Sequence, residues 1–429
     1  MKVLFVYPRF ARHAEAHPEL RTWVPMNEYF GSPSLGLAMM AAVTPQGWEL
    51  EYRDDRMASA DGPTDADLVA FSFFTPAATR AFALAKAFRA QGKTVVAGGI
   101  FPTAMPDECL KHFDAVVTGE GEAVWPQLLV DFKRGALKQR YSQPLASLDG
   151  VPTPNLSLYF NAERDGFVPD DYPVQLTRGC PLACQACILP VSMQRTLREF
   201  SVAHTLKQLR QLRLAGKRAC LTEDTSWFPG QQSNHLRALF RAMIDEGLEA
   251  SISYIGISMP QLLVASDDLL TLARAAGVDM FYLVGGFDPV TTRAFTGEDE
   301  KALSRAHKAI ARAHTFDIEP YTSFLLGNDS DDLKTADRML GFAAESGIKK
   351  AEFAIFTPYP ATPAWDRLSR EDRITTRDWS RYNDANVVFT PKRMSARELE
   401  DGYLYLWREF YGDKSHYASW QQDERTIQF

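Results

Sequence analysis

The chain has 429 residues, which is long for one domain and predicts two or three. Hydrophobic residues make up 45% and charged residues 24%, a balance that excludes a disordered or fibrous protein. The formal net charge of −7 gives no basic field to hold a nucleic-acid backbone, so we expect no nucleic-acid partner.

Residues 1–135 alternate apolar runs with helical patterns. Val3–Tyr7 is continuously apolar, as expected of a parallel strand that is covered on both faces, and Leu35–Val43 follows as a helix. This alternation predicts a doubly wound, Rossmann-like parallel sheet. Further strands are predicted at Trp48–Arg53, Leu68–Phe74, Thr94–Ala97 and Ala115–Thr118, with helices at Ala78–Gln91 and Trp125–Phe132.

Residues 136–171 contain four prolines and no sustained period, which predicts a linker. A second alternation of strands and helices occupies residues 172–364 and predicts a partial (β/α)6 barrel, in which function gathers at the C-terminal ends of the strands. Residues 365–429 predict a small, mainly helical region with one clear helix at Ala396–Tyr411. Six barrel strands are predicted: Val174–Thr177, Arg218–Leu221, Ala250–Ile257, Met280–Val284, Glu319–Leu326 and Ala351–Phe356.

The start of the chain, MKVLFVYPRF, lacks the apolar core and cleavage site of a signal peptide. The apolar stretch from Tyr29 to Leu50 is interrupted by Pro33 and Pro45, whereas a spanning helix needs about 20 mostly apolar residues. We therefore expect no membrane span and a cytoplasmic protein.

Three of the five cysteines, Cys180, Cys184 and Cys187, fall in a C-x3-C-x2-C pattern directly after the first strand of the second domain. Three thiolates on one loop can hold three irons of a [4Fe–4S] cube and leave the fourth iron open. A structural zinc site requires four closed ligands, and no histidine follows at the spacing of a zinc finger. The pattern therefore predicts a single iron–sulfur cluster.

This motif resembles that of the radical S-adenosylmethionine (SAM) enzymes, and the resemblance covers residues 172–360. It implies that the open iron binds SAM and that the reduced cluster cleaves SAM to a 5′-deoxyadenosyl radical. The family usually has an aromatic residue before the last cysteine, where this chain has Ala186. By the same resemblance, the strand ends supply SAM-binding candidates: Glu223, Asp224, Asp288, Ser323 and Thr357.

The first domain resembles the cobalamin-binding domain that precedes the radical barrel in one large subclass. Four landmarks carry the resemblance: Pro33-Ser-Leu-Gly36, Ser72-Phe-Phe-Thr75, Gly98-Gly99-Ile-Phe-Pro102-Thr103 and Gly119-Glu-Gly-Glu122. The Asp-x-His-x-x-Gly motif of cobalamin mutases is missing, so no histidine is expected below the cobalt. The candidate cobalamin-binding residues are Ser34, Gly36, Ser72, Thr75, Gly98, Gly99, Thr103, Gly119 and Glu120.

The resemblance implies a cobalamin-dependent radical SAM methyltransferase with three cofactors: a [4Fe–4S] cluster, SAM and cobalamin. The radical would take hydrogen from an unactivated carbon of a small-molecule substrate, and methylcobalamin would supply the methyl group. Cobalamin would lie between the domains, and a flavodoxin or ferredoxin would donate electrons. The first alternative is a cyclase or ring-rearrangement enzyme with the same cofactors and no net methyl transfer.

Two further alternatives belong to other classes. A non-enzymatic corrinoid- or metal-binding module would have a degenerate barrel, and the intact cysteine motif disfavours it. A methylthiotransferase acting on tRNA would need three more cysteines in its N-terminal domain, where this chain has only Cys109. The substrate itself cannot be deduced from the sequence.

Overall fold

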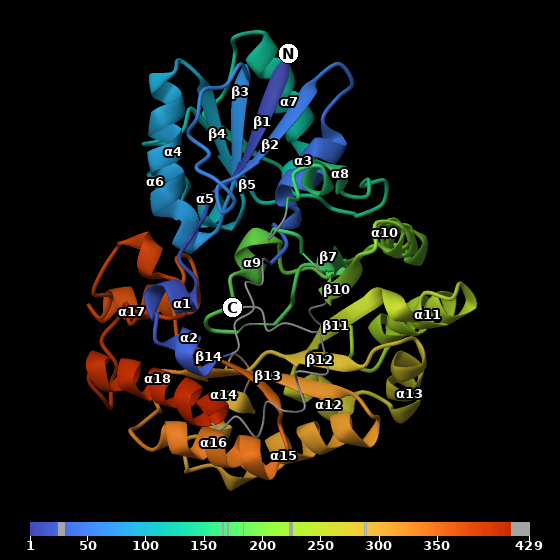
Figure 1. Ribbon diagram of the computed structural model, residues 1–429, viewed down its shortest axis with the longest axis vertical. Coiled ribbons are helices and arrows are strands. Elements are labelled where there is room, and N and C mark those ends of the chain that lie inside the picture. The colour runs from blue at the N-terminus through green and yellow to red at the C-terminus, as the bar shows by residue number, and fades with distance from the viewer. Residues whose placement is uncertain are drawn as a thin grey trace.

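The first domain of the computed structural model is a six-stranded parallel sheet with helices on both faces (Figure 1). The structure describes residues 1–24, 31–164, 167–169, 171–182, 184–222, 226–286, 288 and 290–412. The strand order is β2-β1-β3-β4-β5-β6, so the order reverses between β1 and β3. The strands are β1 (Lys2–Tyr7), β2 (Glu49–Asp54), β3 (Leu68–Ser72), β4 (Thr94–Gly98), β5 (Ala115–Thr118) and β6 (Arg140–Ser142).

Both faces of this sheet are apolar because both are covered. Every residue of β3 is buried, and α4 (Ala78–Ala90) packs Ala81, Leu84, Ala85 and Phe88 inward, one face of a 3.6-residue period. The predicted helix at Leu35–Val43 is confirmed as α3. The remaining helices of this part are α5 (Ile100–Ala104), α6 (Pro106–Cys109), α7 (Trp125–Lys133) and α8 (Ser157–Phe160), with 3₁₀ turns η1 (Thr75–Ala77) and η2 (Gly121–Ala123).

The stretch predicted as a linker, 136–171, contributes to the first domain. Strand β6 extends its sheet by pairing with β5, and the hydroxyl of Tyr159 on α8 donates to the backbone oxygen of Ser34 at 2.6 Å. The backbone N–H of Ala38 donates to the same hydroxyl at 3.0 Å. A three-residue strand has too few positions to show a period, which is why the sequence pattern did not reveal β6.

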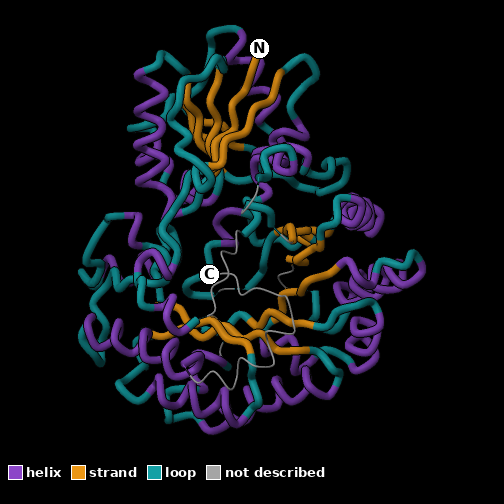
Figure 2. Tube along the Cα trace, in the orientation of Figure 1, coloured by secondary structure: helices purple, strands orange, loops and turns teal. Residues whose placement is uncertain are grey.

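The second domain is a six-stranded parallel sheet in the order β14-β13-β12-β11-β10-β7, with helices outside it (Figure 2). Neighbours in the sheet are consecutive along the chain apart from β8 (Thr177–Arg178) and β9 (Arg198–Glu199), which form a separate two-stranded sheet. This order is expected of a partial β/α barrel. Its strands are β7 (Asp171–Gln175), β10 (Arg218–Thr222), β11 (Ile252–Ile257), β12 (Met280–Leu283), β13 (Glu319–Leu326) and β14 (Lys350–Ile355). Its helices are α10 (Val202–Leu214), α11 (Gln231–Asp245), α12 (Met259–Val264), α13 (Asp267–Ala275), α14 (Thr291–Ala294), α15 (Glu300–Thr315) and α16 (Thr335–Glu345), with the 3₁₀ turn η3 (Glu249–Ser251).

The C-terminal region closes the β14 side of the barrel (Figure 1). It contains α17 (Pro363–Arg370), η4 (Trp379–Arg381) and α18 (Ala396–Gly412), which confirms the predicted helix. Tyr403 and Trp407 of α18 are fully buried, so its aromatic stripe is core packing. Residues 413–429 lie outside the described part of the chain.

The loop after β1 packs against this C-terminal region. Its short helices α1 (His13–Ala16) and α2 (Leu20–Trp23) lie beside α18 (Figure 1). Tyr403 Oη lies 2.8 Å from His13 Nδ1, and His17 Nε2 lies 2.6 Å from the backbone oxygen of Ala385. Burial lowers the pKa of His13 to about 4. The loop after β1 and the C-terminal region as far as α18 therefore pack together.

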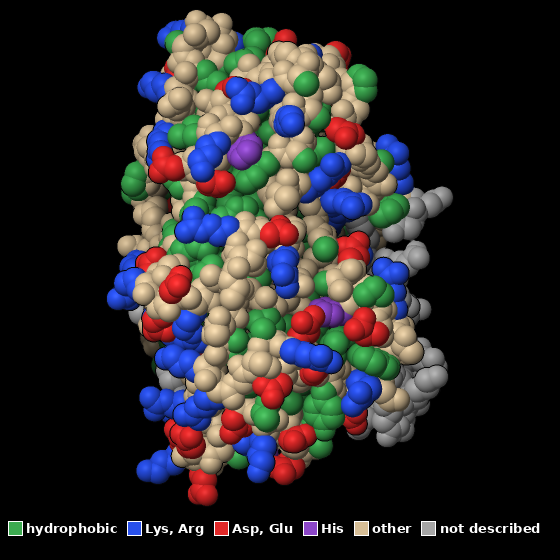
Figure 3. All heavy atoms as spheres, turned by 90° about the vertical axis from the view of Figure 1, so that its left-hand side faces the viewer, with side chains coloured by type: hydrophobic (Ala, Val, Ile, Leu, Met, Phe, Trp, Pro, Cys, Tyr) green, Lys and Arg blue, Asp and Glu red, His purple; other side chains and the backbone are tan. Residues whose placement is uncertain are grey.

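No helix in the described ranges is long and apolar enough to cross a membrane. The face drawn in Figure 3 interleaves acidic and basic side chains, in keeping with the small net charge.

Candidate cobalamin and cluster site

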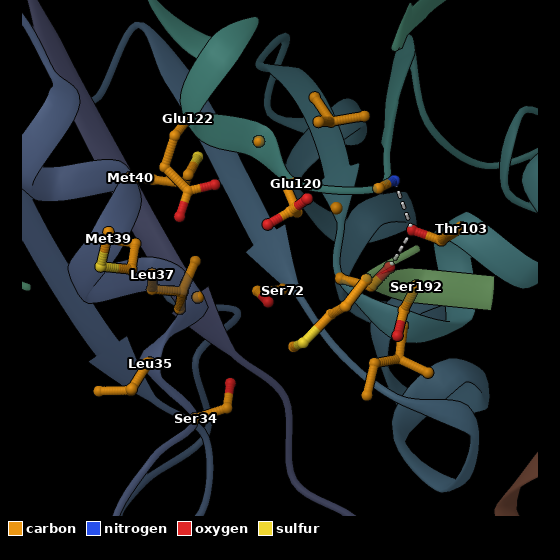
Figure 4. Close-up of a pocket in the computed structure, with 18 of the residues that line it drawn as sticks. Ser34, Leu35, Leu37, Met39, Met40, Ser72, Thr103, Glu120, Glu122 and Ser192 are labelled. Carbon is orange, nitrogen blue, oxygen red and sulfur yellow. Dashed lines mark hydrogen bonds between the residues drawn. The ribbon is translucent and has the colours of Figure 1, made fainter. Parts of the chain in front are cut away.

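A cavity of about 490 Å³ lies at the carboxyl ends of β3, β4 and β5, beside the start of α3 (Figure 4). The cavity adjoins the point between β1 and β3 where the strand order reverses, and such a point is the usual place for a ligand in an open α/β sheet. All the predicted cobalamin residues except Thr75 line it: Ser34, Gly36, Ser72, Gly98, Gly99, Thr103, Gly119 and Glu120. Four separate sequence landmarks therefore contribute to one cavity.

Thr75 is the exception among the predicted cobalamin residues. It is buried at the start of η1 and does not line the cavity. Its landmark contributes through Ser72, Phe73 and Phe74 instead, because the chain turns into η1 directly after them.

The loop between β4 and α5 needs glycine at position 99. Gly99 has a φ of +101°, and a Cβ there would lie 2.9 Å from the backbone nitrogen and oxygen of Phe73. The Thr103 hydroxyl donates to the Gly99 oxygen at 2.7 Å and accepts from the Gly119 N–H at 2.9 Å (Figure 4). These bonds join the ends of β4 and β5 at the cavity wall.

The second domain forms the far wall of the cavity. Gln175, Thr177 and Arg178 line it from the start of the barrel, and Thr222 lines it from the end of β10. The short helix α9 (Leu189–Ser192), which lies within the cysteine loop, adds Leu189 and Ser192. No local sequence pattern indicates that these residues line the cavity, because only the docking of the two domains brings them there.

The three cysteines lie in the loop between β8 (Thr177–Arg178) and β9 (Arg198–Glu199), two short antiparallel strands. Cys180 is buried, and Cys184 and Cys187 are half-buried. The backbone N–H of Cys180 donates to the Gln194 oxygen at 3.2 Å. The loop lies between the two domains, with α9 next to α5 (Figure 1).

The donor set of this loop fits an iron–sulfur cube. It offers three thiols and neither a histidine nor a carboxylate, which leaves one iron for an outside ligand. Burial, and to a lesser extent the charge of Asp288, raises the pKa of the Cys184 thiol. No three Cys, His, Asp or Glu side chains are grouped for metal binding among the described residues, which omit Ala183 inside this loop. The gathering of the three thiols around one cluster therefore stays a prediction.

Gly179 is required by the path of this loop. Its φ is +85°, and a Cβ there would lie 2.2 Å from the backbone oxygen of Thr196 and 2.9 Å from that of Met193. Backbone atoms cannot move aside as the end of a flexible side chain can, so any other residue displaces the strand pair that carries Cys180.

We expect Gly179→Ala to lower the iron content of the reconstituted protein from about four per chain, one cube, toward zero. Gly216→Ala is the matched control, because Gly216 also has a positive φ but a Cβ there meets nothing within 4 Å. Iron analysis and circular dichroism of both variants test this. An alanine variant at 179 that keeps its full iron content would contradict the role of this glycine.

Of the predicted SAM-binding residues, Glu223 and Asp224 lie outside the described part of the chain. Asp288 is buried and caps α14: its carboxylate accepts from the N–H of Val290 at 2.8 Å, the N–H of Thr291 at 3.1 Å and the Thr291 hydroxyl at 2.5 Å. Its negative charge also acts on Cys184, so it lies near the cysteine loop. A contact between Asp288 and SAM stays a prediction.

Ser323 and Thr357 are both buried within the barrel region. Ser323 lies in β13, paired in register with Glu352 of β14, and lies near its side chain. Thr357 follows β14, donates to the Ile355 oxygen at 3.1 Å and lies near the carboxyl group of Asp384. Burial raises the pKa of Asp384 to about 6. Both candidates are therefore buried beside half-buried acids, and their contact with SAM stays a prediction.

The two cysteines outside the motif are packing residues. Cys109 ends α6 and Cys220 lies in β10, and both are buried. Burial raises the pKa of both thiols well above the ordinary range, which disfavours the thiolate that iron binding needs. None of the residues lining the described cavity is a histidine.

Two family models match the chain. Residues 29–129 match the B12 binding domain, and residues 362–425 match a domain of unknown function, DUF4070. The first match spans the cavity wall that β3, β4 and β5 provide.

Relatives align over most of the chain. Bacteriochlorophyllide d C-12(1)-methyltransferase of Chlorobaculum tepidum is 25% identical over 92% of this chain and 86% of its own length. Bacteriochlorophyllide d C-8(2)-methyltransferase of the same organism is 24% identical over 87% of this chain and 86% of its own length. Anaerobic magnesium-protoporphyrin IX monomethyl ester cyclase of Rubrivivax gelatinosus is 22% identical over 97% of this chain and 78% of its own length.

The fold is shared with a solved radical SAM methyltransferase. The structure of TsrM from Kitasatospora setae with cobalamin and a [4Fe–4S] cluster bound superposes with a TM-score of 0.66 at 13% identity, over 97% of this chain and 90% of that one. The architecture is thus that of a B12 domain followed by a radical SAM barrel, as the sequence predicts. Over most of its length the chain is thus similar to enzymes named as methyltransferases and cyclases, and its first domain matches the B12 binding domain. The expected cofactors include the cobalamin and [4Fe–4S] cluster that are bound in the TsrM structure.

Proposed function

We propose that this enzyme is a cobalamin-dependent radical SAM C-methyltransferase that acts on an unactivated carbon of a small-molecule substrate. The observation that carries the proposal is the shared wall of the cavity. Residues of the B12-binding domain form one side, and α9 of the cysteine loop forms the other. A corrinoid in that cavity would lie next to the loop that holds the cluster.

When bound, the cluster and SAM supply hydrogen abstraction, and methylcobalamin supplies the methyl group. The protein's own part is to hold the reacting groups within about 3–3.5 Å and to exclude water. The cavity is suited to exclusion because apolar side chains dominate its lining, among them Leu35, Met39, Phe73 and Trp125. Burial of this kind protects a reactive carbon centre from quenching.

The cluster would be ligated by Cys180, Cys184 and Cys187. The candidates for binding SAM are Glu223, Asp224, Asp288, Ser323 and Thr357. The corrinoid would contact the glycines and hydroxyls of the cavity, while Thr75 is no longer proposed as a direct contact, because it does not line the cavity. A flavodoxin or ferredoxin is the proposed electron donor.

A cyclase or ring-rearrangement activity without net methyl transfer remains a second candidate. It is favoured by the alignment of a relative named as a cyclase over 97% of this chain. Both candidates would use the same cavity and cysteine loop, so geometry does not separate them.

Isotope labelling separates the two functions. With SAM carrying a deuterated methyl group, we expect the methyltransferase to form a product that is heavier by one labelled methyl, together with 5′-deoxyadenosine. Mass spectrometry of reactions with bacteriochlorophyllide-type and hopanoid-type substrates, the classes named for relatives, makes the measurement. A substrate that is consumed with 5′-deoxyadenosine formation but gains no label would contradict methyl transfer and support the cyclase.

A further inference from the structure

Four charged side chains are buried where the two domains meet. Glu120 and Glu122 come from the loop after β5, and Arg178 and Arg198 come from β8 and β9, the strands on either side of the cysteine loop. We propose that this interdomain quartet is a positioning device that fixes the cysteine loop, and so the cluster, against the corrinoid cavity. The inference rests on the proposed cofactors and assigns the glutamates a role other than cobalamin contact.

The quartet is continuous. Arg178 Nη1 donates to Glu120 Oε1 at 3.1 Å, and its Nη2 lies 2.8 Å from Glu122 Oε1. Arg198 Nη1 donates to Glu120 Oε2 at 2.6 Å. One guanidinium thus bridges both carboxylates, which a lysine ammonium cannot do with the same fixed geometry.

All four side chains are almost fully removed from water, with exposed fractions of 4–7%. Charges buried in this way are tolerated only when they are paired and hydrogen-bonded. Two acids come from one domain and two bases from the other, so the charges balance only when the domains are docked in this register. A shifted docking would leave buried charges unpaired, which makes this arrangement specific.

The quartet is connected directly to the first cysteine. Arg178 precedes Gly179 and Cys180 in the chain, and Arg198 Nη2 donates to the backbone oxygen of Met193 at 2.7 Å. Met193 lines the cavity. A displacement of either arginine therefore displaces the ends of the cysteine loop.

Gln194 adds an independent observation. Its amide donates to Glu120 Oε2 at 2.9 Å, while its backbone oxygen accepts from the Cys180 N–H at 3.2 Å. Its φ of +67° is in the left-handed region, which is unfavourable for a non-glycine residue and persists only when the surroundings hold it there. The strained residue thus links Glu120 to the backbone of the first cysteine.

The Gly119-Glu-Gly-Glu122 landmark therefore has two roles: its glycines line the cavity, and its glutamates pair with the arginines of the second domain. Gly119 and Gly121 line the cavity, where the absence of side chains leaves room for a ligand. Glu120 and Glu122 also line the cavity (Figure 4). Their carboxylates are nevertheless engaged by the arginines. A substitution at either glutamate should therefore change the distance and orientation between the two cofactors more than it changes the affinity for either cofactor.

The test uses the full chain reconstituted with iron, sulfide and hydroxocobalamin, in wild type and in Glu120→Gln and Arg178→Lys. Reduction to cob(II)alamin and a reduced cluster gives two paramagnetic centres, whose spin coupling depends on their separation and orientation. We expect both variants to keep about four irons per chain and to bind cobalamin within about threefold of wild type. The spin coupling between cob(II)alamin and the reduced cluster should be weaker, or more broadly distributed, in both variants than in wild type.

Glu163→Gln is the matched control, because Glu163 forms a partly buried ion pair with Lys217, 3.0 Å long, away from the cavity. Its coupling should equal that of wild type. Arg178→Lys keeps the positive charge, so it still tests the positioning role if Glu120→Gln does not fold. Unchanged coupling in the loaded variants would overturn the positioning role alone, whereas a wild-type chain that takes up no corrinoid would overturn the proposed function and this inference with it.

Discussion

Alanine at Cys180, Cys184 or Cys187 is expected to abolish SAM cleavage and to reduce the iron content from about four per chain, the content of one cube, to below about one in the triple variant. The reason is chemical: a thiolate bonds iron directly, and an alanine methyl offers no donor. Iron analysis and quantification of 5′-deoxyadenosine after anaerobic reconstitution make the measurement.

Cys109→Ala is the control for this result. Cys109 is fully buried in the core of the first domain and does not line the cavity, so its loss removes a thiol without touching the cysteine loop. It should retain its iron and its SAM cleavage. Four irons and 5′-deoxyadenosine formation in the triple variant would show that the cluster is held elsewhere.

Gly98→Leu is expected to weaken cobalamin binding by about tenfold or more, which corresponds to about 1.4 kcal/mol. Gly98 lines the cavity, and a Cβ there has only ordinary contacts, the nearest 3.7 Å away, so the new side chain can be accommodated by the protein but occupies space at the ligand site. The dissociation constant is measured by optical titration. The iron content should not change.

Gly62→Leu is the matched control, because its Cβ would also meet its nearest atom at 3.7 Å and it lies outside the cavity. Gly99 is unsuitable for this test, since a side chain there meets the backbone of Phe73 and would report on folding. Cobalamin affinity that is the same in Gly98→Leu and Gly62→Leu would remove this part of the cavity from the corrinoid site.

The fold was predictable because its signals are local. Buried strands such as Leu68–Ser72 are continuously apolar, and the alternation with helices defines a parallel sheet without further information. The position of the cavity follows from the same reasoning, since landmarks at the ends of parallel strands meet at one edge. Short elements such as β6 and α9 could not be predicted from the sequence, because three or four residues are too few to show a hydrophobic period.

What the sequence could not show depends on contacts between distant segments. His13 and His17 follow the first strand of the first domain, yet they pack against Tyr403 and Ala385, 390 and 368 positions later. Glu120 lines the cavity, and its contact with cobalamin stays a prediction. Its oxygens also accept from Arg178, Arg198 and Gln194 of the other domain, which the sequence around Glu120 does not indicate. Such pairings arise only when the domains dock.

The central claim is that one chain holds one iron–sulfur cube and one corrinoid on opposite walls of the same interdomain site. The most direct measurement is the iron and cobalt content of the wild-type chain after anaerobic reconstitution with iron, sulfide and hydroxocobalamin and removal of unbound material. We expect about four irons and one cobalt per chain. A chain that retains iron but no cobalt, or about eight irons that depend on Cys109 and Cys220, would contradict it.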